Sequence, residues 1–146
     1  MGLICDCSVV VNALSVDNNV KFQRVDGTVK GDLKYLANVC DNNLDASSLT
    51  LRFTDKEQAG GVDRSFLFVA GTITSVVCRK ICMNCEVTVT GTGTVGGVTY
   101  PFEAVFRDQV ASSNVDDVQS FVITGFFDQN GAAPVPQGSI VAVGCV

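Results

Sequence analysis

Apolar and polar residues alternate along much of this chain with a period of two. In the segment SLTLRFT, Leu49, Leu51 and Phe53 fall on one face, while Thr50 and Arg52 fall on the other. The segment TYPFEAVFRD repeats the alternation, with aromatic residues on its apolar face. Because successive side chains of a strand point to opposite faces, this pattern predicts β-strands that bury one side.

Four further segments, SFLFVAGTITSVVC, EVTVTGTGTV, SFVITGFF and SIVAVGCV, are rich in the β-branched and aromatic residues that favour strands. Turn-forming residues separate the segments: DNN at 17–19 and at 41–43, and a glycine pair at 96–97 that predicts a tight hairpin. Only residues 32–40 suggest a turn or two of helix. We therefore predict an all-β fold, a single antiparallel β-sandwich or jelly roll of about eight strands.

The length of 146 residues is typical of one domain. We expect residues 1–8 to form a short extended N-terminal connector arm and residues 9–146 to form the β-sandwich or jelly-roll domain. The polar segment 110–119 predicts a loop in which Asp116 and Asp117 are exposed to solvent.

Composition and charge exclude several classes of function. A net charge of −5 argues against binding to nucleic acid, which requires a basic face. No apolar run is long enough to span a membrane, and the opening MGLICDC lacks the basic and apolar regions of a secretory signal. The chain has no histidine, which excludes Ser-His-Asp and Cys-His catalysis and histidine-bound metals. We expect neither an enzyme nor a cofactor.

The segment VCRKICMNC contains Cys78, Cys82 and Cys85 in a C-x3-C-x2-C spacing. Three thiolates at this spacing can hold an iron–sulfur cluster, but a short β-rich chain is the wrong context for the enzymes that use it. The same thiolates, with Cys40 or Cys145 added, could form a structural zinc site. The third interpretation, which the β-rich surroundings favour, is that these cysteines form disulfide bonds.

Seven cysteines cannot all pair inside one chain, so either one thiol stays free or bonds run between chains. Cys5 and Cys7 lie on a short arm that has few contacts of its own. Against a neighbouring subunit, such an arm gains strand pairing and, when oxidised, a covalent bond. Cys145, near the other end, is a candidate acceptor. Contacts of this one-way kind generate an open homopolymer, a filament in which the protein is its own partner.

This layout of cysteines at both ends of a β-sandwich resembles the subunits of bacterial endospore appendages. The resemblance implies that subunits stack into stiff fibres, with Cys5 and Cys7 as connector thiols and Cys145 as an acceptor. It also implies a second acceptor, either Cys40 or one of the three cysteines of residues 78–85. Assembly inside a mother cell, with release on lysis, would place the fibre on the cell or spore surface without a signal peptide.

The sequence thus predicts a structural subunit that self-assembles into a disulfide-cross-linked extracellular or spore-surface filament. Two alternatives stay open. One is a discrete coat or binding module with disulfides inside the chain. The other is a small reduced protein that binds zinc through Cys78, Cys82 and Cys85.

Overall fold

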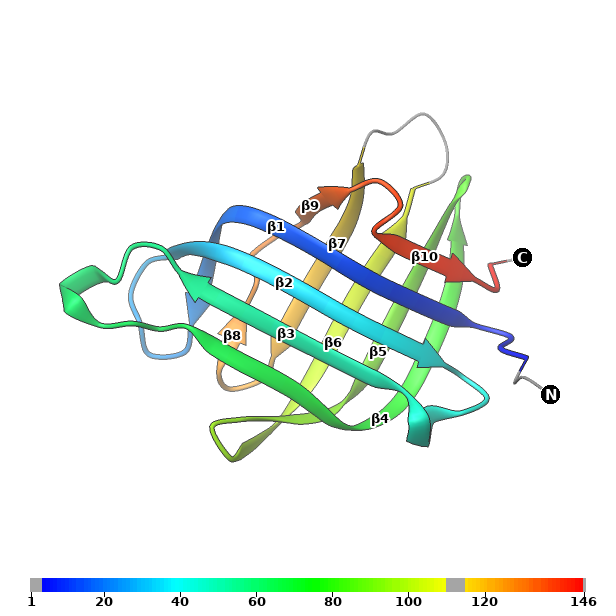
Figure 1. The fold of residues 1–146 in the computed structure, drawn as a ribbon, viewed down its shortest axis with the longest axis horizontal. Helices are drawn as coiled ribbons and strands as arrows, with labels where there is room; N and C mark the ends of the chain where they lie inside the picture. Colours follow the sequence, from blue (N-terminus) through cyan, green and yellow to red (C-terminus); the bar gives the residue numbers. More distant parts are fainter. Residues whose placement is uncertain (1–3, 110–114, 146) are drawn as a thin grey trace.

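The computed structural model describes residues 4–109 and 115–145, and these residues fold almost entirely into β-strands (Figure 1). Within these ranges the strands are β1 (Ser8–Phe22), β2 (Val29–Cys40), β3 (Ser48–Asp55), β4 (Phe66–Ile81), β5 (Asn84–Val95), β6 (Val98–Asp108), β7 (Val115–Ile123), β8 (Phe127–Asp128), β9 (Ala133–Pro136) and β10 (Ile140–Val143). Two single turns of 3-10 helix, η1 (Leu44–Ala46) and η2 (Ala59–Gly61), flank β3. The all-β prediction is confirmed.

The sheet closes on itself. Each strand from β1 to β8 pairs antiparallel with the next, and β8 also pairs with β1, where Lys21 lies opposite Asp128 and Phe22 opposite Phe127. The described residues therefore form a closed barrel of eight antiparallel strands. β10 pairs with the first half of β1, and β9 pairs with β7. All these pairs belong to one continuous sheet, so the predicted division into a sandwich or jelly roll is not confirmed.

Side chains from alternate positions of the strands fill the interior of the barrel. Phe68 is fully buried, and its ring packs edge-to-face against Phe102 and Phe121, with centroid distances of 5.2 and 5.9 Å. An eight-stranded barrel is just wide enough for side chains to fill it. The centre of this barrel is thus a packed core, which leaves its ends and its outer face for contacts with other molecules. None of the described residues forms a helix long and apolar enough to cross a membrane.

The helical turn expected within residues 32–40 is wrong, because this segment belongs to β2. Its burial alternates: Leu33, Tyr35 and Val39 are buried, whereas Leu36 is exposed. β2 is paired along both edges, with β1 and with β3. These two ladders outweigh the modest helix propensity of its leucine, alanine and lysine residues.

The predicted turns have different outcomes. The hairpin at 96–97 is confirmed, since Val95 pairs with Val98 across two glycines whose φ angles are positive, 56° and 84°. The turn predicted at 17–19 is wrong. β1 continues through it with a bulge, where the pairing to β2 shifts between Ser15 and Asn18 and Asp17 takes a φ of 58°.

The loop predicted over 110–119 is only partly tested. Residues 110–114 lie outside the described residues, and the rest belongs to β7. Asp116 is fully buried, and its carboxylate accepts backbone N–H bonds from Gln109 at 2.9 Å, Gly138 at 2.9 Å and Ile140 at 3.1 Å. The expectation of an exposed Asp116 is therefore wrong. Its carboxylate is buried because it accepts hydrogen bonds from backbone N–H groups that would otherwise have no partner.

Replacing Asp116 with Asn should lower the free energy of unfolding by about 2–3 kcal/mol. An amide keeps one oxygen but turns a donor group toward backbone N–H groups that need an acceptor. Urea unfolding followed by circular dichroism measures the loss.

The matched control is Asp117→Asn. Asp117 accepts bonds from the side chains of Gln109 and Gln119, which can rotate to suit an amide. We expect a loss below about 0.5 kcal/mol for this variant. Equal losses in the two variants would contradict the role given to Asp116.

Candidate functional site at the cysteine end

Both ends of the described chain lie at the same end of the barrel, where disulfide bonds attach them to strands (Figure 1). The three bonds are Cys5–Cys40, Cys7–Cys78 and Cys85–Cys145, with Cα–Cα distances of 5.4, 5.7 and 5.5 Å. These distances are usual for disulfides. Cys82 is unpaired and exposed. We call this region, which contains all seven cysteines, the cysteine end.

The structure pairs within the chain all four cysteines that the sequence suggested for bonds between subunits, Cys5, Cys7, Cys40 and Cys145. The reason is the shortness of the arm. β1 begins at Ser8, which lies opposite Cys40, so the preceding residues stay close to their own barrel. With these pairings, none of the four is available for a bond to another chain.

The C-x3-C-x2-C spacing does not bring its three thiols together. Ile81 pairs with Asn84, so Cys82 and Met83 form the two-residue turn between β4 and β5. Cys82 has a φ of 55°, a left-handed conformation that residues other than glycine seldom adopt. The turn separates the exposed Cys82 from Cys85, which is buried.

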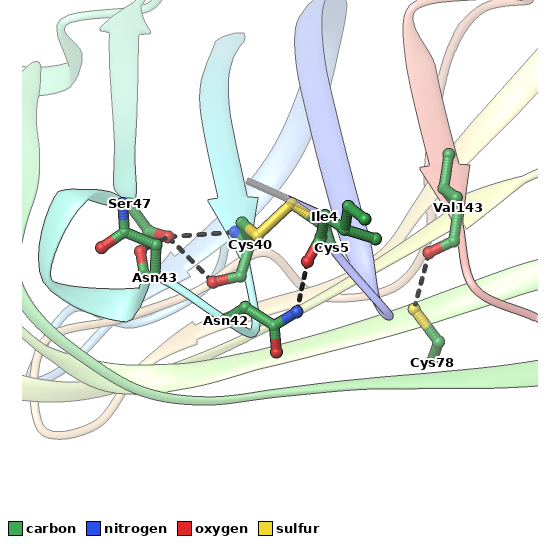
Figure 2. The surroundings of a disulfide bond; sticks show 8 residues. All are labelled: Ile4, Cys5, Cys40, Asn42, Asn43, Ser47, Cys78 and Val143. Atoms are coloured by element: carbon green, nitrogen blue, oxygen red, sulfur yellow. Dashed lines mark hydrogen bonds between the residues drawn. A yellow bond between two sulfur atoms is a disulfide. The ribbon is translucent and has the colours of Figure 1, made fainter. Parts of the chain in front are cut away.

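Hydrogen bonds hold the N-terminal residues beside the loop after β2. The side-chain amide of Asn42 donates to the carbonyl of Ile4 (Figure 2). The backbone N–H of Asp41 donates to the carbonyl of Cys7 at 3.0 Å. Ser47 Oγ accepts the N–H of Cys40 at 3.0 Å. The Cys5–Cys40 disulfide therefore joins two segments that are also hydrogen-bonded to each other.

The C-terminal residues pack directly on the N-terminal ones. Gly144 has a φ of 115°, and a Cβ at this position would overlap the carbonyl oxygen of Asp6 and the Cα of Cys7. Cys78 Sγ lies 3.5 Å from the carbonyl oxygen of Val143 (Figure 2). This is a packing contact, because a disulfide sulfur has no hydrogen to donate. Glycine is thus required where the two ends of the chain meet.

Two of the disulfides lie side by side. The Sγ atoms of Cys78, Cys85 and Cys145 all lie within 4.8 Å of one another, and Cys7 is bonded to Cys78. Cys7 and Cys85 are buried. Sequence reasoning missed this group of four, because 71 positions separate Cys7 from Cys78 and no local spacing marks them as neighbours.

Two carboxylates are neighbours of Cys85 in the sheet, Glu86 along β5 and Asp108 opposite it on β6. Glu86 follows Cys85 and accepts bonds from Arg107 at 2.7 Å and Arg79 at 3.0 Å. Burial of Glu86 acts to raise the pKa of its carboxyl, but the two guanidinium groups outweigh burial and lower that pKa. Asp108 differs, since burial raises its pKa despite the N–H bond it accepts from Ala142 at 3.0 Å.

The opposite end of the barrel carries aromatic rings. Phe66 and Phe126 pack edge-to-face at a centroid distance of 5.0 Å, and Tyr100 stacks on Phe126 at 5.4 Å. A shallow hollow lies beside these rings, lined in part by Arg64. We call Phe66, Tyr100, Phe126 and Arg64 the aromatic end.

Comparison of the chain with protein-family models, curated proteins and solved structures gives no match. The chemistry of the site therefore has to be judged from its side chains. The paired cysteines can attach both ends of the chain to the barrel, and the exposed thiol of Cys82 can form a bond with a second molecule.

Replacing Gly144 with Ala should lower the free energy of unfolding of the oxidised protein by about 3 kcal/mol. The new methyl group must push apart the two chain ends that the disulfides hold together. Gly27→Ala is the matched control, since Gly27 has a φ of 75° but nothing within 4 Å of an added Cβ. It should lose about 1 kcal/mol, so equal losses in urea unfolding would contradict close packing at Gly144.

Proposed function

We propose that this protein is a structural subunit of an extracellular or spore-surface assembly. It associates with copies of itself through an exposed apolar face of the barrel and is cross-linked through Cys82. The observation that carries this proposal is the apolar face, which lies on the outside of β10, β1 and β2.

The apolar face consists of five exposed side chains on three neighbouring strands: Val10, Leu14, Leu36, Val141 and Val143, each 45–55% exposed. Val10 and Val141 are direct cross-strand neighbours. Leu36 lies opposite Asn12. Val10 and Leu14 are two residues before and after Asn12 on the same face of β1, so Leu36 is a diagonal neighbour of both. Asn12, Lys34 and Asn38 share this outer surface, so polar side chains separate some of the five. Single exposed apolar residues are ordinary, whereas five gathered on three neighbouring strands suit a contact with another molecule.

The outer surface of β5, on another side of the barrel, differs in composition from the apolar face. The outward positions of β5 hold a row of threonines, Thr88, Thr90, Thr92 and Thr94. Threonine suits a strand while presenting a hydroxyl to water. The neighbouring strand β4 exposes Leu67, Val69 and Val77, with Val69 opposite Thr94 and Val77 opposite Thr88, so this flank mixes hydroxyl and apolar side chains.

Cys82 supports covalent cross-linking. Its thiol is exposed, and its φ of 55° would suit glycine or asparagine better, so a cysteine here costs stability. Met83 beside it is 65% exposed. One thiol per chain can link only two chains, so any longer assembly needs a second, non-covalent contact. The apolar face is our candidate for that contact, which replaces the N-terminal thiols that the sequence suggested.

The three disulfides support a location outside the reducing cytosol, because such bonds persist in oxidising surroundings. A fibre or layer exposed to the environment also gains from bonds that constrain the unfolded chain. The proposed cell- or spore-surface location depends on this argument.

A second candidate is a discrete coat or binding module, which the aromatic end favours. Partly exposed rings beside Arg64 would suit a ligand that combines a flat apolar part with a negative charge. A binding module needs no association between subunits, so the experiment below distinguishes the two functions.

Sedimentation velocity over a range of concentrations should show self-association of the Cys82→Ser variant, in which only non-covalent contacts remain. Adding Val10→Lys and Val141→Lys should weaken that association at least about tenfold, because two charges would be buried at the contact. On non-reducing gels the wild type should give a monomer and a dimer, and Cys82→Ser a monomer alone.

The control is Val98→Lys, which charges a valine that is 52% exposed but lies outside the apolar face, in the hairpin at 96–97. It should associate as the parent does. Monomeric behaviour of the parent at every concentration would contradict the proposal and leave the binding module as the better account.

A further inference from the structure

The two disulfides that lie side by side bring together the sulfurs of Cys7, Cys78, Cys85 and Cys145. Three of these sulfurs lie within 4.8 Å of one another, and the fourth is bonded to one of the three. In a tetrahedral zinc site with bonds of about 2.3 Å, neighbouring sulfurs are about 3.8 Å apart. Across the two disulfides the spacing must shrink by about 1 Å, and within each disulfide the sulfurs must separate from about 2 Å to about 3.8 Å once the bond is reduced.

The four cysteines lie at defined positions of the backbone. Cys78 and Cys85 are held on the paired strands of the β4–β5 hairpin. Cys7 and Cys145 lie just outside β1 and β10, and the carbonyl of Cys7 accepts the N–H of Asp41. After reduction, the sulfurs regroup from pairs to a tetrahedron by rotation of the cysteine side chains.

We propose that, when its two disulfides are reduced, this cluster binds one zinc ion through Cys7, Cys78, Cys85 and Cys145. Zinc favours four thiolates in a closed structural site. This ligand set differs from the C-x3-C-x2-C group of the sequence, because it excludes Cys82 and includes Cys7 from the other end of the chain. It goes beyond the proposed structural function and does not depend on self-association.

The exchange balances in electrons and protons. Two dithiol molecules give four electrons and four protons to the two disulfides, and each dithiol becomes a disulfide. The four cysteine thiols then release four protons as their thiolates bind one Zn²⁺. Reoxidation by a disulfide oxidant reverses the sequence and releases the metal.

The exchange between disulfides and bound zinc would keep the two ends of the described chain attached in both reducing and oxidising surroundings. The same four side chains can hold both chain ends against the barrel as a zinc site in a reducing compartment and as disulfides in an oxidising one. The barrel could thus fold before it is oxidised. Glu86 follows Cys85 on β5, so its side chain lies on the other face of the strand, where it is paired with two arginines. Asp108 lies opposite Cys85 in the β5–β6 ladder, and its carboxylate accepts the N–H of Ala142 at 3.0 Å.

The test uses the full chain, reduced with a phosphine under nitrogen, freed of reductant and titrated with cobalt(II) and then zinc(II). We expect one cobalt per chain, with the intense visible bands of tetrahedral thiolate coordination, and displacement by one equivalent of zinc. Circular dichroism recorded in parallel should show a folded barrel in the metal-bound protein.

Variants identify the ligands. Cys82→Ser and the double variant Cys5→Ser/Cys40→Ser should bind the metal as the wild type does, whereas Cys145→Ser and Cys7→Ser should lose the four-thiolate spectrum. Reduced protein without stoichiometric metal, folded or not, would overturn the inference. Loss of the four-thiolate spectrum in Cys82→Ser would also overturn the inference, as would its retention in Cys145→Ser. Either result would assign the metal to Cys78, Cys82 and Cys85 of the β4–β5 hairpin.

Discussion

The structure depends on how β1 is held along the edge opposite β2, because the barrel closes there. On this edge the first four residues of β1 pair with β10 and its last two with β8, and these partners span only four and two residues. Such short strands give few ladder bonds, so covalent links complete the closure. Cys7–Cys78 and Cys85–Cys145 attach the ends of β1 and β10 to the β4–β5 hairpin, and each loop closure contributes roughly 4 kcal/mol by constraining the unfolded chain.

This closure also decides what the surface can do. Six cysteines are used inside the chain, so Cys82 is the thiol left for another molecule. A closed barrel has no long unpaired edge for strand addition, and association must use side chains instead. The exposed apolar residues of β10, β1 and β2 are suited to this, and they lie on the strands that the disulfides hold in place. The proposed self-association therefore involves the same region as the covalent closure.

The sequence predicted features that depend on neighbours in the chain. Alternation and β-branched or aromatic content identified β3 to β7 and β10 but missed the long strands β1 and β2, and two glycines identified the hairpin at 96–97. The alternation of residues could not predict that the barrel closes between β8 and β1, since β8 is too short to show any pattern. The pairing of seven cysteines is likewise not encoded locally. Asp116 was misjudged because its three N–H partners come from segments that only the folded barrel brings together.

The pairing of the cysteines is the central claim, and peptide mapping tests it most directly. The unreduced monomer is alkylated at acidic pH, digested with trypsin and analysed by mass spectrometry. Cleavage after lysine and arginine should give two disulfide-linked sets, one joining peptides 1–21, 35–52 and 65–79 and the other joining 81–107 to 108–146, with Cys82 alkylated. A bond that links the two sets, or a disulfide that contains Cys82, would contradict the account.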